Sequence, residues 1–275
     1  MASEPNATFS GVVVTVDGSR HSESALPVAA ALARSLPGGL TVVKVAETDA
    51  EADRRYVDGL AGALDAQAQV VAGDAEASDL LLRELATRPE ELLVMATHGH
   101  GGVLESLIGS FASRIVRSAS RPVVLVSSRV PAPAADARFE KIVVPLDGSE
   151  FSESVLPQAA GLAGALRVPL ELVEVLEPGA GRIAAETKGD VLESSYVRSA
   201  ARRLAGEGVE VANWEVLHGS PAKAISDYVR AGTGTLLAMA THGRSGLLRS
   251  ILGSVAGACV HESGVPVMVW RPQSR

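Results

Sequence analysis

Aromatic residues make up only 3% of this 275-residue chain, and cysteine occurs once, as Cys259. So few rings argue against an aromatic-rich β-sandwich or a sugar-binding cleft. One thiol cannot form an intrachain disulfide, and a lone thiol is typical of a reducing compartment. No uninterrupted apolar run reaches the ~18 residues that a membrane-spanning helix needs. We therefore expect a cytoplasmic protein without a membrane segment.

Positive charge is also in the minority. The chain has 25 Lys and Arg against 32 Asp and Glu, which gives a formal net charge of −7. Nucleic acids and anionic membranes attract proteins that carry an excess of basic residues. Neither is therefore a predicted partner. Hydrophobic residues amount to 47% of the chain, which is enough to form a core without disulfides.

An internal repeat is the strongest pattern in the chain. Residues 17–27 read DGSRHSESALP and residues 147–157 read DGSEFSESVLP, which agree at eight of eleven positions. The segment MATHG occurs at 95–99 and at 239–243, and Gly-Ser follows each copy after nine residues. We predict two homologous domains, residues 9–128 and 139–271, joined by a Pro/Ala linker at 129–138.

Short β-branched runs alternate with helical segments in both copies. The expected strands are residues 12–16, 40–45, 69–71, 92–96 and 123–126, then 142–146, 170–175, 209–217, 236–240 and 265–269. Ser22 and Ser152 are the expected N-caps of the helices that follow the first strand of each copy. This alternation predicts an α/β fold of two tandem, open-sheet, Rossmann-like domains, each a five-stranded parallel sheet flanked by helices. The last strand of each copy should lie at a sheet edge, and the two edges can pair antiparallel.

Three features of each copy should meet beyond the carboxyl ends of the strands, where open α/β sheets bind ligands. They are an aspartate after the first strand, a glycine-containing loop after the fourth, and Gly-Ser at the start of the last helix. Glycine lets backbone amides approach a phosphate, and a helix N-terminus presents free N–H groups. The chain has no P-loop motif and no G-x-G-x-x-G after the first strand. The pattern favours a phosphate-bearing ligand; alternatively, the glycines only turn the chain and the serine caps a helix.

Taken together, the aspartate, MATHG, the nine-residue spacing to Gly-Ser and the closing Pro-Val strand resemble the universal stress protein family, here in tandem. The family's phosphate motif is Gly-x2-Gly-x9-Gly-[Ser/Thr], and members that carry it bind ATP. In this chain Ala96 and Ala240 stand at the first glycine of that motif. The resemblance implies an adenine nucleotide alpha hydrolase-like fold with one ATP site per domain, Mg²⁺ being a candidate companion. It also implies an unidentified protein partner, and pairing of domains as a pseudo-dimer within the chain or as a homodimer.

The same resemblance assigns residues to each end of the nucleotide. The adenosine end would be lined by Asp17 and Thr15 in the first domain and by Asp147 and Pro145 in the second. Val45 and Val175 would offer backbone groups to the adenine, and Ala96 and Ala240 would face the ribose. The residues that would surround the phosphates are Gly99, His100, Gly102, Gly109 and Ser110, and in the second domain Gly243, Arg244, Gly246, Gly253, Ser254 and Val255.

Three classes of function stay open at this point. The first is an ATP-binding regulatory protein of the stress response, which the resemblance favours. The second is a slow ATP hydrolase or nucleotidyl transferase, although neither copy has an evident general base beside the phosphate loop. The third is a dimerisation scaffold that no longer binds a nucleotide. No catalytic residue and no metal site are predicted, and His98 and His242 are interpreted as structural.

The two sites are also predicted to differ. Equivalent residues of the two copies are 130 positions apart in the sequence near the start of each copy and 144 positions apart near its end. The second copy therefore has additional residues after its second strand. The first copy has His100 where the second has Arg244, and an imidazole carries less positive charge at neutral pH. We therefore predict that the first site is more open and binds ATP more weakly.

Overall fold

The computed structural model describes residues 6–46, 50–98, 108–127, 129–134, 137–177, 195–242 and 251–272. In the first half the strands are β1 (Gly11–Thr15), β2 (Leu40–Val45), β3 (Gln67–Val71), β4 (Glu91–Ala96) and β5 (Val123–Val126). Its helices are α1 (Arg20–Glu23), α2 (Leu26–Ala33), α3 (Ala50–Leu64), α4 (Ala77–Ala86) and α5 (Ser110–Ser118). This half contains the alternation of strands and helices that the sequence predicts.

The second half repeats this order. Its strands are β6 (Lys141–Leu146), β7 (Leu170–Leu176), β8 (Val211–His218), β9 (Thr235–Ala240) and β10 (Val267–Trp270). Its helices are α6 (Glu150–Glu153), α7 (Leu156–Leu166), α9 (Ser195–Gly206), α10 (Pro221–Arg230) and α11 (Ser254–Glu262). None of the helices in the described stretches combines the length and the apolar character that crossing a bilayer requires.

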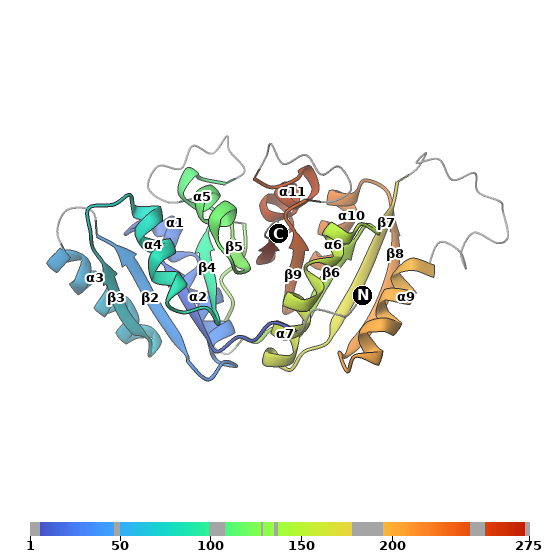
Figure 1. Cartoon of the computed structure of the whole chain (residues 1–275), viewed down its shortest axis with the longest axis horizontal. Helices are drawn as coiled ribbons and strands as arrows, with labels where there is room; N and C mark the ends of the chain where they lie inside the picture. The colour runs from blue at the N-terminus through green and yellow to red at the C-terminus, as the bar shows by residue number, and fades with distance from the viewer. Residues whose placement is uncertain are drawn as a thin grey trace.

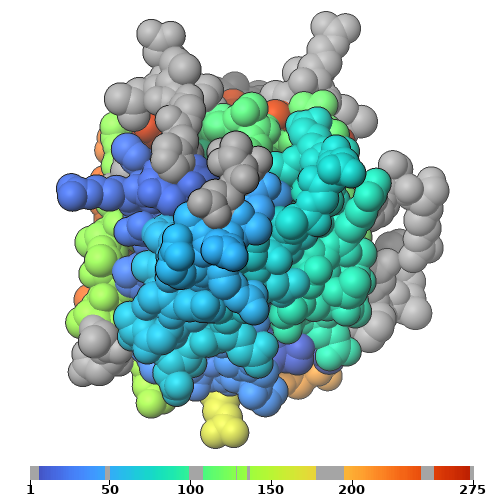
Figure 2. Space-filling model, turned by 90° about the vertical axis from the view of Figure 1, so that its left-hand side faces the viewer, coloured from blue at the N-terminus to red at the C-terminus, as the bar shows by residue number. Residues whose placement is uncertain are grey.

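The ten strands form one sheet in the order β3-β2-β1-β4-β5-β10-β9-β6-β7-β8, with helices on both faces (Figure 1). Neighbouring strands within each half are parallel, which confirms the predicted α/β fold. Residues 12–14 of β1 are at most 1% exposed, because helices cover both sides of the strand. Figure 2 views the outer end of the first half, where α3 and α4 both contact the edge strand β3.

The two halves join through β5 and β10. These strands pair antiparallel, with Leu125 opposite Val267 and Val123 opposite Val269. All four side chains are at most 2% exposed. The pairing therefore covers two apolar edges that would otherwise face water, as the sequence predicts. β10 begins two residues later than expected, and Pro266, which has no N–H to donate, lies just before it.

The first helix of each half begins earlier than the sequence analysis predicts, so the expectation that Ser22 and Ser152 are N-caps is wrong. The N-caps are Ser19 and Ser149, whose side chains accept hydrogen bonds from the backbone N–H groups of Ser22 and Ser152. The reason is a tight turn after the strand: Gly18 has φ +93°, a conformation that glycine adopts without strain. A four-residue helix then precedes the apolar helix on which the prediction was based.

The segment before β1 crosses to the second half (Figure 1), where its backbone packs on α7. The Ala7 N–H donates a hydrogen bond of 3.1 Å to the carbonyl of Pro157. A Cβ atom added to Gly161 would collide with the Ala7 carbonyl oxygen, so the crossing depends on glycine at this position. Phe9, between the crossing point and β1, packs against the core.

The segment before β6 makes the reciprocal contact. Arg34, at the end of α2, donates a hydrogen bond to the carbonyl of Ala137. The β5–β10 pairing, the segment before β1 and the segment before β6 therefore all hold one half to the other.

Replacing Gly161 with alanine should lower the free energy of unfolding by about 1–3 kcal/mol, because the new methyl group collides with the Ala7 carbonyl. Gly164 is the matched control in the same helix, since no atom outside the adjacent backbone of that helix lies within 4 Å of its Cβ position. Gly164→Ala should stabilise the protein by about 0.5–1 kcal/mol through helix propensity. Denaturant unfolding measures both. Equal stabilisation by the two substitutions would contradict the packing of residue 7 on α7.

Replacing Val267 with proline should loosen the junction, because proline removes a backbone donor from a strand that has neighbours on both sides. A loss of about 2 kcal/mol would lower the Tm by roughly 5 °C or more. Gln67→Pro, at the first residue of the edge strand β3, should cost less. Unchanged Tm and unchanged small-angle scattering for Val267→Pro would show that the junction does not hold the halves together.

Candidate functional site

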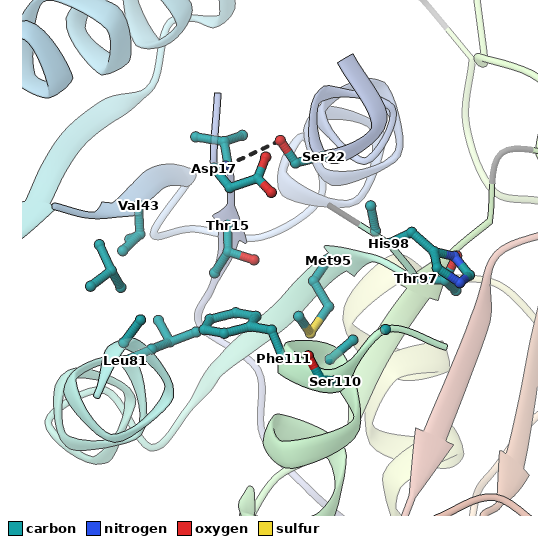
Figure 3. A pocket seen from close by; sticks show the side chains of 16 residues that line it. Thr15, Asp17, Ser22, Val43, Leu81, Met95, Thr97, His98, Ser110 and Phe111 are labelled. Atoms are coloured by element: carbon teal, nitrogen blue, oxygen red, sulfur yellow. Dashed lines mark hydrogen bonds between the residues drawn. The ribbon is translucent and has the colours of Figure 1, made fainter. Parts of the chain in front are cut away.

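A cavity of about 250 Å³ opens beyond the carboxyl ends of β1, β2 and β4 in the first half (Figure 3). β1 lies between β2 and β4, so this is the point at which the strand order reverses. Six residues predicted for the first site line the cavity: Thr15, Asp17, Val45, Ala96, Gly109 and Ser110. The other three, Gly99, His100 and Gly102, lie outside the described residues.

One part of the cavity wall is apolar. Val43 and Val45 come from the end of β2, Met95 from β4 and Leu81 from α4. Phe111, the second residue of α5, completes this wall. Apart from Val45, none of these residues is among the predicted site residues. They come from separate elements and have no shared motif, so only the tertiary structure brings them together.

The polar part of the cavity contains the Thr15 hydroxyl, the Asp17 carboxylate and the first turn of α5. Asp17 is also part of the turn after β1, because its Oδ1 accepts a hydrogen bond of 2.9 Å from the Ser19 N–H. In the second half, Asp147 Oδ1 accepts from the Ser149 N–H at 3.0 Å and from the Ser149 hydroxyl at 2.6 Å. The repeated Asp-Gly-Ser therefore has a structural role in both halves and holds each carboxylate at the carboxyl edge of the sheet.

The glutamate in each repeated Ser-Glu-Ser also has a structural partner. Glu23 accepts a hydrogen bond of 2.8 Å from the Tyr56 hydroxyl, and Glu153 accepts one of 2.8 Å from the Tyr196 hydroxyl. Burial first, and then the glutamate, raise the pKa of both tyrosines above the ordinary value. Both phenols therefore stay protonated donors, and they tie α3 and α9 to the helices that follow the first strand of each half. No repeated motif predicts these pairs, because the tyrosines lie in the segments where the two copies differ.

The glycine of each Gly-Ser pair allows the last helix to approach the end of the fourth strand. The Gly109 N–H donates to the carbonyl of Thr97 at 2.7 Å, and the Gly253 N–H donates to that of Thr241 at 2.6 Å. A Cβ atom on either glycine would lie 3.3 or 3.2 Å from the same carbonyl oxygen, which is a tight contact. These glycines are therefore explained by packing within the protein as well as by approach to a ligand.

The serine of each pair does not cap its helix. Gly109 and Gly253 are the N-cap residues, and neither α5 nor α11 has a side-chain hydrogen bond at its cap. Ser110 and Ser254 are the first residues of these helices. The alternative interpretation of the serine as a helix cap is therefore wrong. Since Gly109 has no side chain, the N-cap residue offers no side-chain acceptor to the first N–H groups of α5 beside the cavity.

The two histidines that follow β4 and β9 interact with neighbouring threonines. His98 Nδ1 lies 3.0 Å from Thr97 Oγ1, and His242 Nδ1 lies 3.1 Å from Thr241 Oγ1. The His242 ring also packs edge-on against Phe151 at 5.9 Å between centroids. In the described parts of the chain, no group of three His, Cys, Asp or Glu residues could hold a metal ion.

The second half places its predicted residues at equivalent positions. The described ones are Pro145 on β6, Asp147 after it, Val175 on β7, Ala240 on β9, and Gly253, Ser254 and Val255 at the start of α11. The other three, Gly243, Arg244 and Gly246, lie outside the described residues. Pro145 replaces Thr15 and Val255 replaces Phe111, so the second half lacks a hydroxyl group and a ring that the first half has at these positions.

The family model and the curated relatives identify one family. The model of the universal stress protein family matches residues 8–127 and again residues 138–271. A universal stress protein of Mycobacterium tuberculosis is 30% identical over 95% of this chain and 97% of its own length. A universal stress protein structure from Archaeoglobus fulgidus has a TM-score of 0.62 and 20% identity, and covers 95% of this chain and 96% of that chain. A structure from Pseudomonas aeruginosa, at 14% identity, has a TM-score of 0.66 over 96% of this chain and 94% of that chain.

The two structural likenesses show the fold, and the two family matches together with the M. tuberculosis relative show the family. This chain belongs to the universal stress protein family, with two Usp domains in tandem.

Proposed function

We propose that this protein is a cytoplasmic, adenine-nucleotide-binding regulator with one ATP site in each domain. Nucleotide occupancy would control its contact with a protein partner, and the β5–β10 junction makes the chain an intrachain pseudo-dimer. One observation carries the proposal: a cavity at the switch point of the sheet has an apolar wall and, beside it, the first turn of α5, whose N-cap residue Gly109 has no side chain to cap it.

The lining residues fit the parts of an adenine nucleotide. Val43, Val45 and Leu81 provide an apolar surface for the base, and the Asp17 carboxylate can accept hydrogen bonds from ribose hydroxyls. The N–H groups at the start of α5 and the Ser110 hydroxyl suit a phosphate, because a helix N-terminus favours negative charge. A volume of about 250 Å³ lies just below the range typical of pockets for drug-sized ligands. The cavity therefore suits the base and sugar, and leaves the phosphates at the helix end.

A bound nucleotide would supply a multiply charged phosphate chain beside α5. Mg²⁺ would arrive with it, since this ion is usually held by substrate phosphates and waters together with few protein groups. We propose binding in preference to hydrolysis. The one carboxylate among the described lining residues, Asp17, is already engaged in the turn after β1.

Ser110→Asp and Ser254→Asp test the two sites separately. An acidic residue in the first turn of a helix is favourable for the helix, yet it repels a phosphate at the same place. Isothermal titration of nucleotide-free protein with ATP should give two sites for the wild type and one for each variant. The affected site should be weakened at least about 10-fold, equivalent to ~1.4 kcal/mol.

Ser110→Ala is the matched control, because it removes the hydroxyl without adding charge and should weaken binding only a few-fold. Serine is preferred to glycine for this test, since a side chain at Gly109 or Gly253 would press on a neighbouring backbone carbonyl. Unchanged Tm values would show that the variants fold. No ATP binding by the wild type, or unchanged stoichiometry and affinity in both aspartate variants, would refute the proposed function.

A further inference from the structure

We propose that the Phe111 ring stacks on the base of the nucleotide bound in the first site. Contacts with the base then contribute more to nucleotide affinity in the first site than in the second. This inference rests on the proposed function and deepens it. It does not depend on the phosphate loop, because Phe111 belongs to the described part of the cavity wall.

The position of Phe111 follows from the packing of α5. This helix buries Ala112, Ile115 and Val116. Phe111 precedes this buried set and lies in the first turn, on the side that lines the cavity. Figure 3 shows its ring extending from α5 toward Leu81, with Thr15 above it in that view.

The ring is unusually open to solvent for so large an apolar group. Phe111 is 36% exposed, and in the described part of the chain Trp214 is the other large hydrophobic residue exposed to this degree. It is also the single Phe, Tyr or Trp side chain among the described residues that line the cavity. A flat ligand group that covered the ring would remove its remaining apolar surface from water, which is favourable in proportion to the area covered.

A nucleobase fits this wall better than an aliphatic group does. Stacking of a base on an aromatic side chain is worth ~1–3 kcal/mol, equivalent to a factor of roughly 5–150 in affinity. Val43 and Val45 line the same cavity, so a base in contact with the ring would also meet aliphatic surface. The Asp17 carboxylate and the start of α5 then remain for the sugar and the phosphates.

The second half lacks the aromatic ring. Val255 follows Gly253-Ser254 where Phe111 follows Gly109-Ser110. The shorter valine has no ring to stack on a base, and it stays beside the phosphates, where the resemblance places Val255. The base would therefore contribute a larger share of the nucleotide affinity in the first site, and the phosphates a larger share in the second site.

The test compares ATP with tripolyphosphate, which has the phosphates without the base, in the Ser254→Asp background. There Phe111→Val should weaken ATP binding about 10-fold and leave tripolyphosphate binding unchanged. Phe111→Leu keeps a large aliphatic side chain without aromaticity and should lose most of the same affinity.

Val255→Phe in the Ser110→Asp background should tighten ATP binding at the second site. The Phe111→Val variant has the residue that the second domain uses at this position, so the fold should tolerate it.

Phe111→Trp gives a direct optical measurement in the same protein. Its added fluorescence should be quenched by adenosine and by ATP, but not by tripolyphosphate. Unchanged or tighter ATP binding by Phe111→Val, or no quenching by adenosine, would overturn the stacking proposal. If the wild type binds one ATP and Ser254→Asp abolishes it, the inference fails, and of the proposed function only the site in the second domain remains. If the wild type binds no ATP, both fail.

Discussion

The antiparallel pairing of β5 with β10 is the interaction on which the rest of the structure depends. Each half alone would expose an apolar strand at the edge of its sheet, and such an edge recruits another strand or must be covered. Here the edge of one half covers the edge of the other. Since both halves are on one chain, the pairing of their edges does not depend on the protein concentration.

The junction also determines which elements share a core. Ala112 and Ile115 of α5 belong to the same buried cluster as Ala256 and Val260 of α11, and the paired strands contribute to it. The two helices whose first turns would meet phosphates are therefore packed over one common surface. On the opposite face, α2, α3, α7 and α9 share the other cluster with β1 and β6. The chain before β1 adds a further contact there by crossing to α7.

The residues that repeat between the halves combine two tasks. Asp17 and Asp147 hold the turn that starts a helix, and Gly109 and Gly253 bring a helix end against a strand end. These tasks belong to folding, and they also build the edge at which the proposed nucleotide would place its phosphates. Positions without such a task have diverged: β2 has Lys44, paired with Asp53 at 3.2 Å, where β7 has Glu174. The two copies are therefore most similar at residues that both stabilise the fold and belong to the candidate site.

The sequence by itself determined the tandem organisation, the parallel sheets, the edge pairing and one side of the candidate site, because these depend on local periodicity and on short motifs at constant spacing. It placed the helix N-caps wrongly, since the turn at Gly18 begins a helix one turn before the apolar pattern starts. Only the tertiary structure decided that Leu81, Met95 and Phe111 share a cavity with the motif residues. It likewise decided that Gly161 must lack a side chain for residue 7 to pack on α7. The cavity wall and the packing of residue 7 on α7 both depend on close contact between elements that are far apart in the sequence. Periodicity within a single helix or strand does not predict such contacts.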